Sequence, residues 1–140
     1  MGGELRWTEA LATGIETIDA QHREIFDAVN ALIDAIGEGR GAEAVLELFD
    51  FLDGYVSRHF ALEELHMQRH GYPGYGGHRQ AHLDFAEDLA LLRERLEEEG
   101  GAPLLVREIR LHVCDWLVNH IARVDGALGR YLLSREARGE

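Results

Sequence analysis

The sequence lacks lysine. All 14 basic residues of the 140-residue chain are arginines, and 26 acidic residues bring the formal net charge to −12. The arginines are interleaved with acids and form no basic run, so nucleic acid and anionic membrane surfaces are poor candidate partners. The single cysteine, Cys114, cannot form an internal disulfide, and nothing else indicates an oxidising compartment. The cytoplasm is therefore the expected location.

Long hydrophobic runs are missing as well. No apolar run reaches the roughly 18 residues of a membrane-spanning helix, and residues 1–7 contain no apolar core of a signal peptide. The composition, 46% hydrophobic and 29% charged, is typical of a globular protein. A chain of this length is expected to form one domain over residues 1–140.

Proline is scarce, and the breaks in the chain are mostly glycine-rich. The two prolines are Pro73 and Pro103, and glycines gather at 37–41, 71–77 and 100–101. Between these breaks apolar residues recur at steps of three and four, which is the spacing of one helix face, and no strand-like alternation of useful length occurs. The pattern predicts helices over about residues 19–37, 42–69, 77–99, 103–125 and 127–136.

These helices predict an all-α fold. We expect an antiparallel up-down four-helix bundle with short connections, preceded by an irregular N-terminal arm of about residues 1–18. Asp19 is the expected N-cap of the first helix. Gly126 and Gly129 are expected to interrupt the fourth helix, which leaves a short C-terminal helix after them.

The inner stripes of these helices carry metal-binding side chains where a bundle core is normally apolar. These residues are His22, His59, Glu63, His78, His82, His120 and Asp125. Side chains four residues apart on a helix share a face and can converge on one ion. Burying so many unpaired imidazoles and carboxylates would cost more free energy than a small domain can lose. Metal coordination would remove that cost.

The number of donors predicts two metal ions. Five imidazoles and two carboxylates are too many for one ion, but a carboxylate can bridge two ions through its two oxygens. If both carboxylates and one solvent-derived hydroxide bridge, and the imidazoles divide three and two, one ion has six ligands and the other has five. The absence of thiolate ligands favours iron or manganese. The open position beside a redox-active ion suits a small ligand such as O2.

Four stretches of the sequence resemble one known family. They are Ile18–His22, His59–Met67 with the pattern HFxxEExxM, Tyr72-Pro73 followed by His78–His82, and Trp116–Asp125 with the pattern WLxxHIxxxD. Together they resemble the hemerythrins, specifically the single-domain bacterial type called bacteriohemerythrins. All seven ligand positions of the family are filled, and the resemblance extends from Trp7 to about Leu132.

The resemblance implies reversible O2 binding at a non-heme di-iron site. By matching, His78, His82 and His120 hold one iron and His22 and His59 the other. Glu63, Asp125 and a hydroxide or oxide bridge the two irons, and O2 binds at the open position of the two-histidine iron. The residues that match the walls of the family's O2 pocket are Ile25, Phe60, Trp116, Leu117 and Ile121.

More than one function is compatible with such a site. An oxygen carrier, store or sensor without enzymatic turnover is the leading hypothesis. The alternatives are a di-iron oxidase or peroxidase, a nitric-oxide-handling enzyme, and an iron or redox sensor. Enzyme di-iron sites in four-helix bundles are usually rich in carboxylates. Five histidines with two carboxylates therefore favour binding of O2 over its cleavage.

Two further expectations concern the fourth helix. His120 and Asp125 are five residues apart, about 140° on a regular helix, so a π-type turn is expected between Asn119 and Gly129 to bring them to one face. Gly126 occupies a position where many family members have lysine, which removes a cation beside Asp125. The other three histidines, His66, His70 and His112, match no ligand position and are expected to be bystanders.

Overall fold

The computed structural model describes residues 5–40, 42–99 and 109–137, and within these ranges it is helical with no strand. The first three long helices are α1 (Glu16–Gly37), α2 (Ala42–Arg69) and α3 (Tyr75–Glu99). The described part of the fourth comprises the π-helical η2 (Arg110–Cys114), α5 (Asp115–Asn119), the π-helical η3 (His120–Asp125) and α6 (Gly126–Ala137). None of the described helices is long and apolar enough to cross a membrane.

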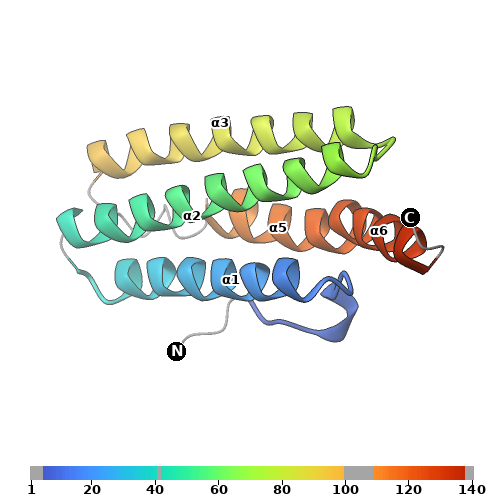
Figure 1. Cartoon of the computed structure of the whole chain (residues 1–140). Coiled ribbons are helices and arrows are strands. Elements are labelled where there is room, and N and C mark those ends of the chain that lie inside the picture. Colours follow the sequence, from blue (N-terminus) through green and yellow to red (C-terminus); the bar gives the residue numbers. More distant parts are fainter. Residues whose placement is uncertain (1–4, 41, 100–108, 138–140) are drawn as a thin grey trace.

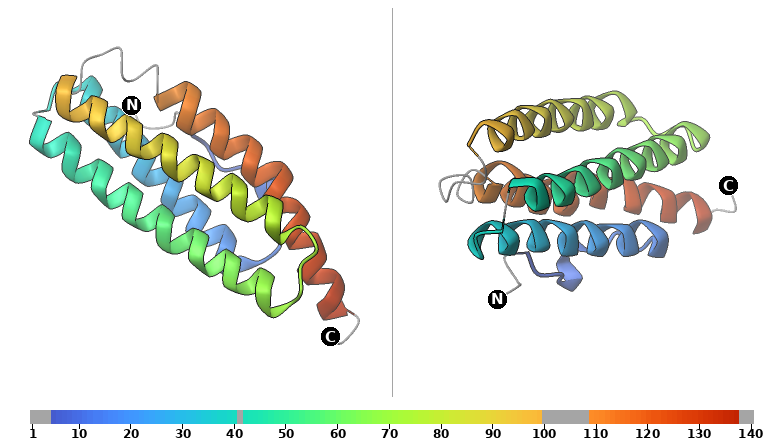
Figure 2. Two further views of the ribbon diagram at one scale, coloured as in Figure 1. Left: turned by 90° about the horizontal axis from the view of Figure 1, so that it is seen from above. Right: turned by 90° about the vertical axis from the view of Figure 1, so that its left-hand side faces the viewer.

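The helices form the expected antiparallel up-down bundle. Figure 1 shows the axes of α1, α2, α3 and the α5–α6 rod roughly aligned, and both views of Figure 2 show the four rods packed alongside one another. Helices α1 and α2 pack together, as do α2 and α3. The predicted all-α bundle is therefore confirmed. The expected start of the fourth helix at residue 103 lies outside the described residues.

The apolar core is divided into two parts along the bundle. The larger part includes Phe49, Phe85 and Leu89, and the smaller consists of Met67, Leu128 and Leu132. On α2, Glu63 lies between Phe60 of the large part and Met67 of the small part. The seven candidate ligand side chains thus form a polar layer between two apolar ones, which is where water is least able to reach them.

The N-terminal arm is anchored by a buried aspartate. Helix α1 begins at Glu16, so Asp19 lies inside its first turn, and the expectation that Asp19 caps the helix is wrong. Its carboxylate instead accepts hydrogen bonds from the Thr13 amide and hydroxyl, at 2.8 and 2.7 Å, and from the Gly14 amide at 3.3 Å. Gly14 has a φ of +87°, which lets the arm bend around this carboxylate.

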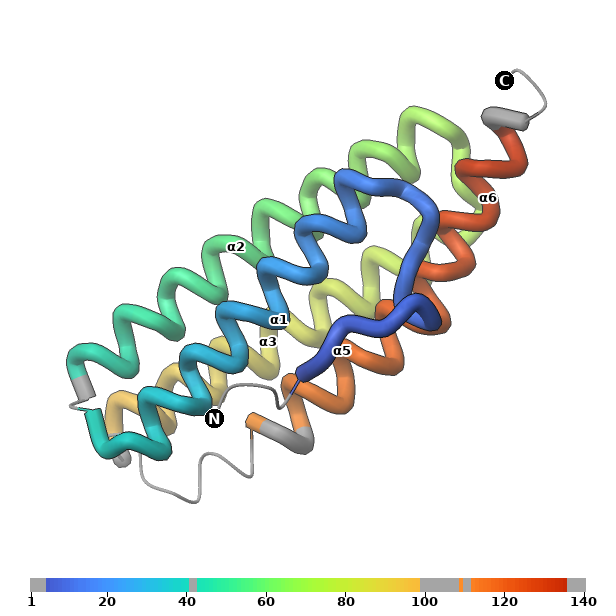
Figure 3. Tube along the Cα trace, turned by 90° about the horizontal axis from the view of Figure 1, so that it is seen from below, coloured from blue at the N-terminus to red at the C-terminus, as the bar shows by residue number. Residues whose placement is uncertain are grey.

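The arm then runs along the outside of the bundle, as the blue segment beside α5 in Figure 3 shows. The side-chain amide of Asn30 donates to the Leu5 carbonyl and accepts from the Leu5 amide, both at 2.9 Å, which fixes the start of the described arm to α1. At Gly129 a Cβ would lie 2.3 Å from the Thr13 carbonyl oxygen. Gly129 therefore permits close packing of the arm.

The predicted glycine interruption of the fourth helix is not found. α6 follows η3 without a non-helical residue, because helical hydrogen bonding continues through Gly126 and Gly129. The π-type turn expected between Asn119 and Gly129 is confirmed, since η3 spans His120–Asp125. The second π-helical segment, η2, carries no polar pair that would have indicated it in the sequence.

Candidate metal centre

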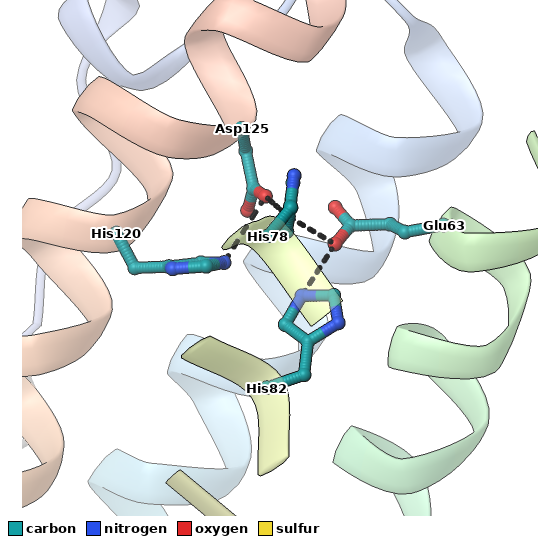
Figure 4. Close-up of side chains that lie close together, drawn as sticks. All are labelled: Glu63, His78, His82, His120 and Asp125. Carbon is teal, nitrogen blue, oxygen red and sulfur yellow. Dashed lines mark ion pairs between the residues drawn. The ribbon is translucent and has the colours of Figure 1, made fainter. Parts of the chain in front are cut away.

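All four helical rods contribute side chains to one buried cluster. His22 comes from α1, and α2 supplies His59 and Glu63. Helix α3 supplies His78 and His82, and His120 and Asp125 are the first and last residues of η3. Every one of the seven is at most 5% exposed. Figure 4 shows five of them, with the imidazoles directed at the two carboxylates.

The π-helical segment explains how residues five apart reach the same cluster. A regular helix would place Asp125 about 140° away from His120, whereas a π-helical turn brings position i+5 back to the face of position i. The Nε2 atom of His120 lies 3.3 Å from Oδ1 of Asp125. The local widening of the helix is thus a requirement of the site, as such bulges often are.

The three imidazoles from α3 and η3 face one oxygen of each carboxylate. The Nε2 atoms of His78 and His120 lie 2.8 and 3.3 Å from Oδ1 of Asp125, and that of His82 lies 3.2 Å from Oε1 of Glu63. Each of these five residues offers one donor atom, and those atoms lie within 4.8 Å of one another. They form the three-histidine group.

The two imidazoles from α1 and α2 face the other oxygen of each carboxylate. His22 Nε2 is 3.0 Å from Oδ2 of Asp125, and His59 Nε2 is 3.2 Å from Oε2 of Glu63. With the two carboxylates, they form a second set of donors within 4.8 Å, the two-histidine group. The carboxylates are shared because their two oxygens point to opposite groups.

These donor atoms are buried and have no hydrogen-bond partner within the described ranges. They are the Nε2 atoms of His22, His59, His78, His82 and His120, both Glu63 oxygens and Oδ1 of Asp125. Buried polar atoms are nearly always paired, and each unpaired one costs free energy. Two cations between the groups would coordinate all of them. The donor set, imidazole and carboxylate without thiolate, therefore fits a pair of iron ions.

The charges within the cluster compensate one another even without metal. Burial opposes ionisation of Glu63, but the four imidazoles that face it hold the pKa of its carboxyl well below the usual range. Burial likewise opposes protonation of His22 and His78, but Asp125 and Glu63 raise the pKa of each imidazole to about 9. Burial and Glu63 oppose ionisation of Asp125 as well, but His120, His22 and His78 hold the pKa of its carboxyl below the usual range, so both carboxylates are ionised at neutral pH.

Two polar side chains that the sequence reasoning missed hold ligand imidazoles from behind. Nδ1 of His59 lies 2.6 Å from Oε1 of Gln21, and Nδ1 of His82 lies 2.9 Å from Oε2 of Glu64. An amide oxygen and a carboxylate oxygen only accept, so both Nδ1 atoms carry the proton and both Nε2 atoms are free to bind metal. In the sequence, Gln21 directly precedes His22 and Glu64 directly follows Glu63. This adjacency to a candidate ligand is the signal by which the sequence could have indicated them.

All five expected O2-pocket residues belong to the larger apolar core or pack against it, and two of them contact imidazoles of the cluster. Ile25, Phe60, Leu117 and Ile121 are buried in the larger apolar core, and Trp116 is half-buried against it. The Phe60 ring stacks on His82 with centroids 3.7 Å apart, and Trp116 stacks on His120 at 4.3 Å. Trp7 of the arm, another residue that the sequence did not single out, lies 6.4 Å from the ring of His22.

The remaining three histidines are outside both donor groups. His66 and His70 are half-exposed near the end of α2, and burial together with neighbouring cations lowers the pKa of His66. His112 is exposed and lines a surface groove with Asp88 and Leu92. None of the three is placed to bind a metal held by the cluster.

Comparisons with known proteins agree with this geometry. Residues 13–132 match the hemerythrin HHE cation binding domain. The chain is 36% identical to a bacteriohemerythrin of Methylococcus capsulatus, over 89% of this chain and 94% of that protein. It is 31% identical to a myohemerythrin of Sipunculus nudus, over 85% and 86% of the two chains. A crystal structure of wild-type hemerythrin matches with a TM-score of 0.80 and 34% identity, over 91% of this chain and 97% of the other.

Proposed function

Because this chain belongs to the hemerythrin family, we propose that it binds O2 reversibly at a non-heme di-iron site, as an oxygen carrier, store or sensor. One observation carries the proposal: seven buried donors divide into groups of three and two imidazoles around two shared carboxylates. We place the protein in the cytoplasm, with O2 as its ligand and no nucleic-acid partner, on the basis of its single cysteine and its excess of acidic residues.

Each group would hold one iron. His78, His82 and His120 would hold the first, His22 and His59 would hold the second, and Glu63 and Asp125 would be shared by both. When bound, the iron pair supplies the electrons that O2 takes up on binding and returns on release. The group with two imidazoles has fewer protein donors, so an exogenous ligand has room to bind there.

The surrounding side chains exclude water and fix the ligands. Ile25, Leu117 and Ile121 are at most 2% exposed and belong to the larger apolar core, which admits little water. The flat contacts of Phe60 with His82 and of Trp116 with His120 prevent these imidazoles from rotating. Exclusion of water and of other reactants favours release of O2 unchanged over its reduction. The histidine-rich donor set also favours binding of O2 over its reduction, so we propose binding without turnover.

Cycles of oxygenation test this function. The iron-loaded protein is reduced without air, its visible spectrum is recorded, O2 is admitted, and O2 is then removed under vacuum. We expect two irons per chain and a spectrum that changes with O2 and returns in every cycle. Steady consumption of O2 in the presence of a reductant, well above the rate of spontaneous autoxidation, would instead support a di-iron oxidase. A variant with His70→Ala should cycle as the unaltered protein does.

A further inference from the structure

The two iron-binding groups differ in the charge of the residue behind one imidazole. In the three-histidine group, His82 donates its Nδ1 proton to the carboxylate of Glu64, 2.9 Å away. In the two-histidine group, His59 donates its Nδ1 proton to the neutral amide of Gln21, 2.6 Å away. Glu64 takes no part in the donor groups, and its position on α2 directs it away from the carboxylate layer, toward His82 of α3.

A carboxylate behind an imidazole makes its Nε2 a stronger electron donor than an amide does. The hydrogen bond to a charged acceptor is the stronger of the two types, and it shifts electron density from the Nδ1–H bond into the ring. A more basic ligand stabilises the higher oxidation state of the metal that it binds. Glu64 should therefore favour the ferric state of the iron in the three-histidine group.

Glu64 also connects this group to the surface. Its other oxygen, Oε1, lies 3.7 Å from Nε of Arg79, and the two side chains are 23% and 50% exposed. A cation so close to Glu64 withdraws negative charge from the carboxylate, which weakens it as an acceptor for His82. Because the pair is solvent-exposed, this effect should weaken as salt screens it.

We propose that Glu64 is a positioning residue that lowers the reduction potential of the three-histidine iron through His82, and that Arg79 moderates this effect from the protein surface. The proposal rests on the proposed di-iron function and deepens it. It assigns different electronic roles to the two irons: the first is biased toward the ferric state, and the second, backed by an amide, binds O2. A carboxylate at position 64 thus strengthens the hold on O2, since binding formally oxidises both irons.

Three variants test the sign of each effect, and two of them exchange nearly isosteric side chains. Glu64→Gln removes the charge behind His82, and Gln21→Glu adds one behind His59. Arg79→Gln removes the cation beside Glu64, and Arg40→Gln, whose partner is the exposed Glu38, is the matched control for loss of an exposed arginine. For each variant, we would measure the iron content, the midpoint potential of the Fe(III)/Fe(II) couple and the O2 affinity. In the potential measurement an electrode supplies one electron per iron.

We expect Glu64→Gln to raise the potential and weaken O2 binding by about tenfold, the lower end of the range for such partners, which corresponds to about 59 mV for a one-electron couple. Gln21→Glu should lower the potential. Arg79→Gln should lower it by less, and its difference from the unaltered protein should vanish at high salt. In metal-free protein, the ¹⁵N chemical shifts of His82 should move in Glu64→Gln and not in Arg40→Gln.

The outcomes separate this proposal from the proposed function. If the unaltered protein fails to bind two irons or O2, the di-iron function is wrong. If all variants bind two irons but Glu64→Gln leaves the potential and O2 affinity unchanged, the role of Glu64 is wrong. A shift of the same sign in all three variants would show a general disturbance of the site, and it would overturn the proposal as well.

Discussion

The two histidine groups are built by different means although they share both carboxylates. The three-histidine group rests on regular helix α3 and on the π-helical η3, and its His120 is covered by the half-buried Trp116. The two-histidine group rests on α1 and α2, and its His22 lies beside Trp7 of the N-terminal arm. The first is therefore held by the bundle itself, whereas the cover of the second depends on how well the arm is anchored.

Both histidine groups depend on the shared carboxylates. Removal of either carboxylate should therefore have the largest effect on iron content and stability. Glu63→Ala or Asp125→Ala removes a buried carboxylate that faces imidazoles of both groups. Loss of one partner from a buried charged set costs about 3–5 kcal/mol. We expect iron to fall below one ion per chain and the free energy of unfolding to fall with it, as measured by metal analysis and urea denaturation. Equal loss in His66→Ala would contradict the assignment.

Without metal, the free energy of unfolding should depend on pH, because one histidine of each group titrates. His22 and His78 have pKa values raised to about 9 from the ordinary 6.5, so their pairing stabilises the metal-free protein fully below pH 6.5. That stabilisation is lost as pH rises through 9. We expect the urea midpoint of metal-free protein to fall between pH 7 and pH 10, while that of iron-loaded protein stays flat. A flat profile without metal would show that these imidazoles are neutral.

The arm provides a way to disturb the two-histidine group alone. In Gly129→Ala the new Cβ would lie 2.3 Å from the Thr13 carbonyl oxygen, so the arm must shift. We expect a loss of about 1–3 kcal/mol from this overpacking, and faster autoxidation of the oxygenated protein. Gly77→Ala, in α3 with nothing near its Cβ, is the control and should be stabilising by up to about 1 kcal/mol. Equal autoxidation rates in the two variants would contradict a covering role for the arm.

Trp7→Leu should have the smallest effect. The indole contacts the rings of His22 and Phe26 from outside the donor groups, so a smaller apolar residue leaves all seven donors in place. We expect full iron content and a modest rise in autoxidation rate. A matched Phe51→Leu change, at an exposed position of α2 about two turns before His59, should leave the rate unaltered. Loss of iron in Trp7→Leu would show that the arm positions the ligand and does not merely cover it.

The sequence was sufficient to predict the bundle and the polar layer because both depend on spacing along single helices. His59 and Glu63 share a face whatever surrounds them, and the five-residue step from His120 to Asp125 required the π-type turn that the structure contains. These predictions needed only helix geometry and the cost of burying charge.

Features that depend on contacts between segments could not be predicted in this way. The pairing of Gln21 with His59 requires the relative register of α1 and α2, and that of Glu64 with His82 requires the register of α2 and α3. The sequence predicts a helix cap at Asp19, but its actual role, which is to accept from the Thr13 amide, depends on the path of the arm. The sequence predicts a helix break at Gly129, whereas the glycine serves the close approach of the Thr13 carbonyl, which local sequence does not reveal.

The central claim is that this chain holds two inequivalent irons between its two groups of imidazoles. A crystal structure of the reduced, iron-loaded protein with anomalous diffraction at the iron edge tests it most directly. We predict two iron peaks, one bound by the Nε2 atoms of the three-histidine group and one by those of the two-histidine group, with Glu63 and Asp125 touching both. A single peak, or a carboxylate that touches only one iron, would contradict it.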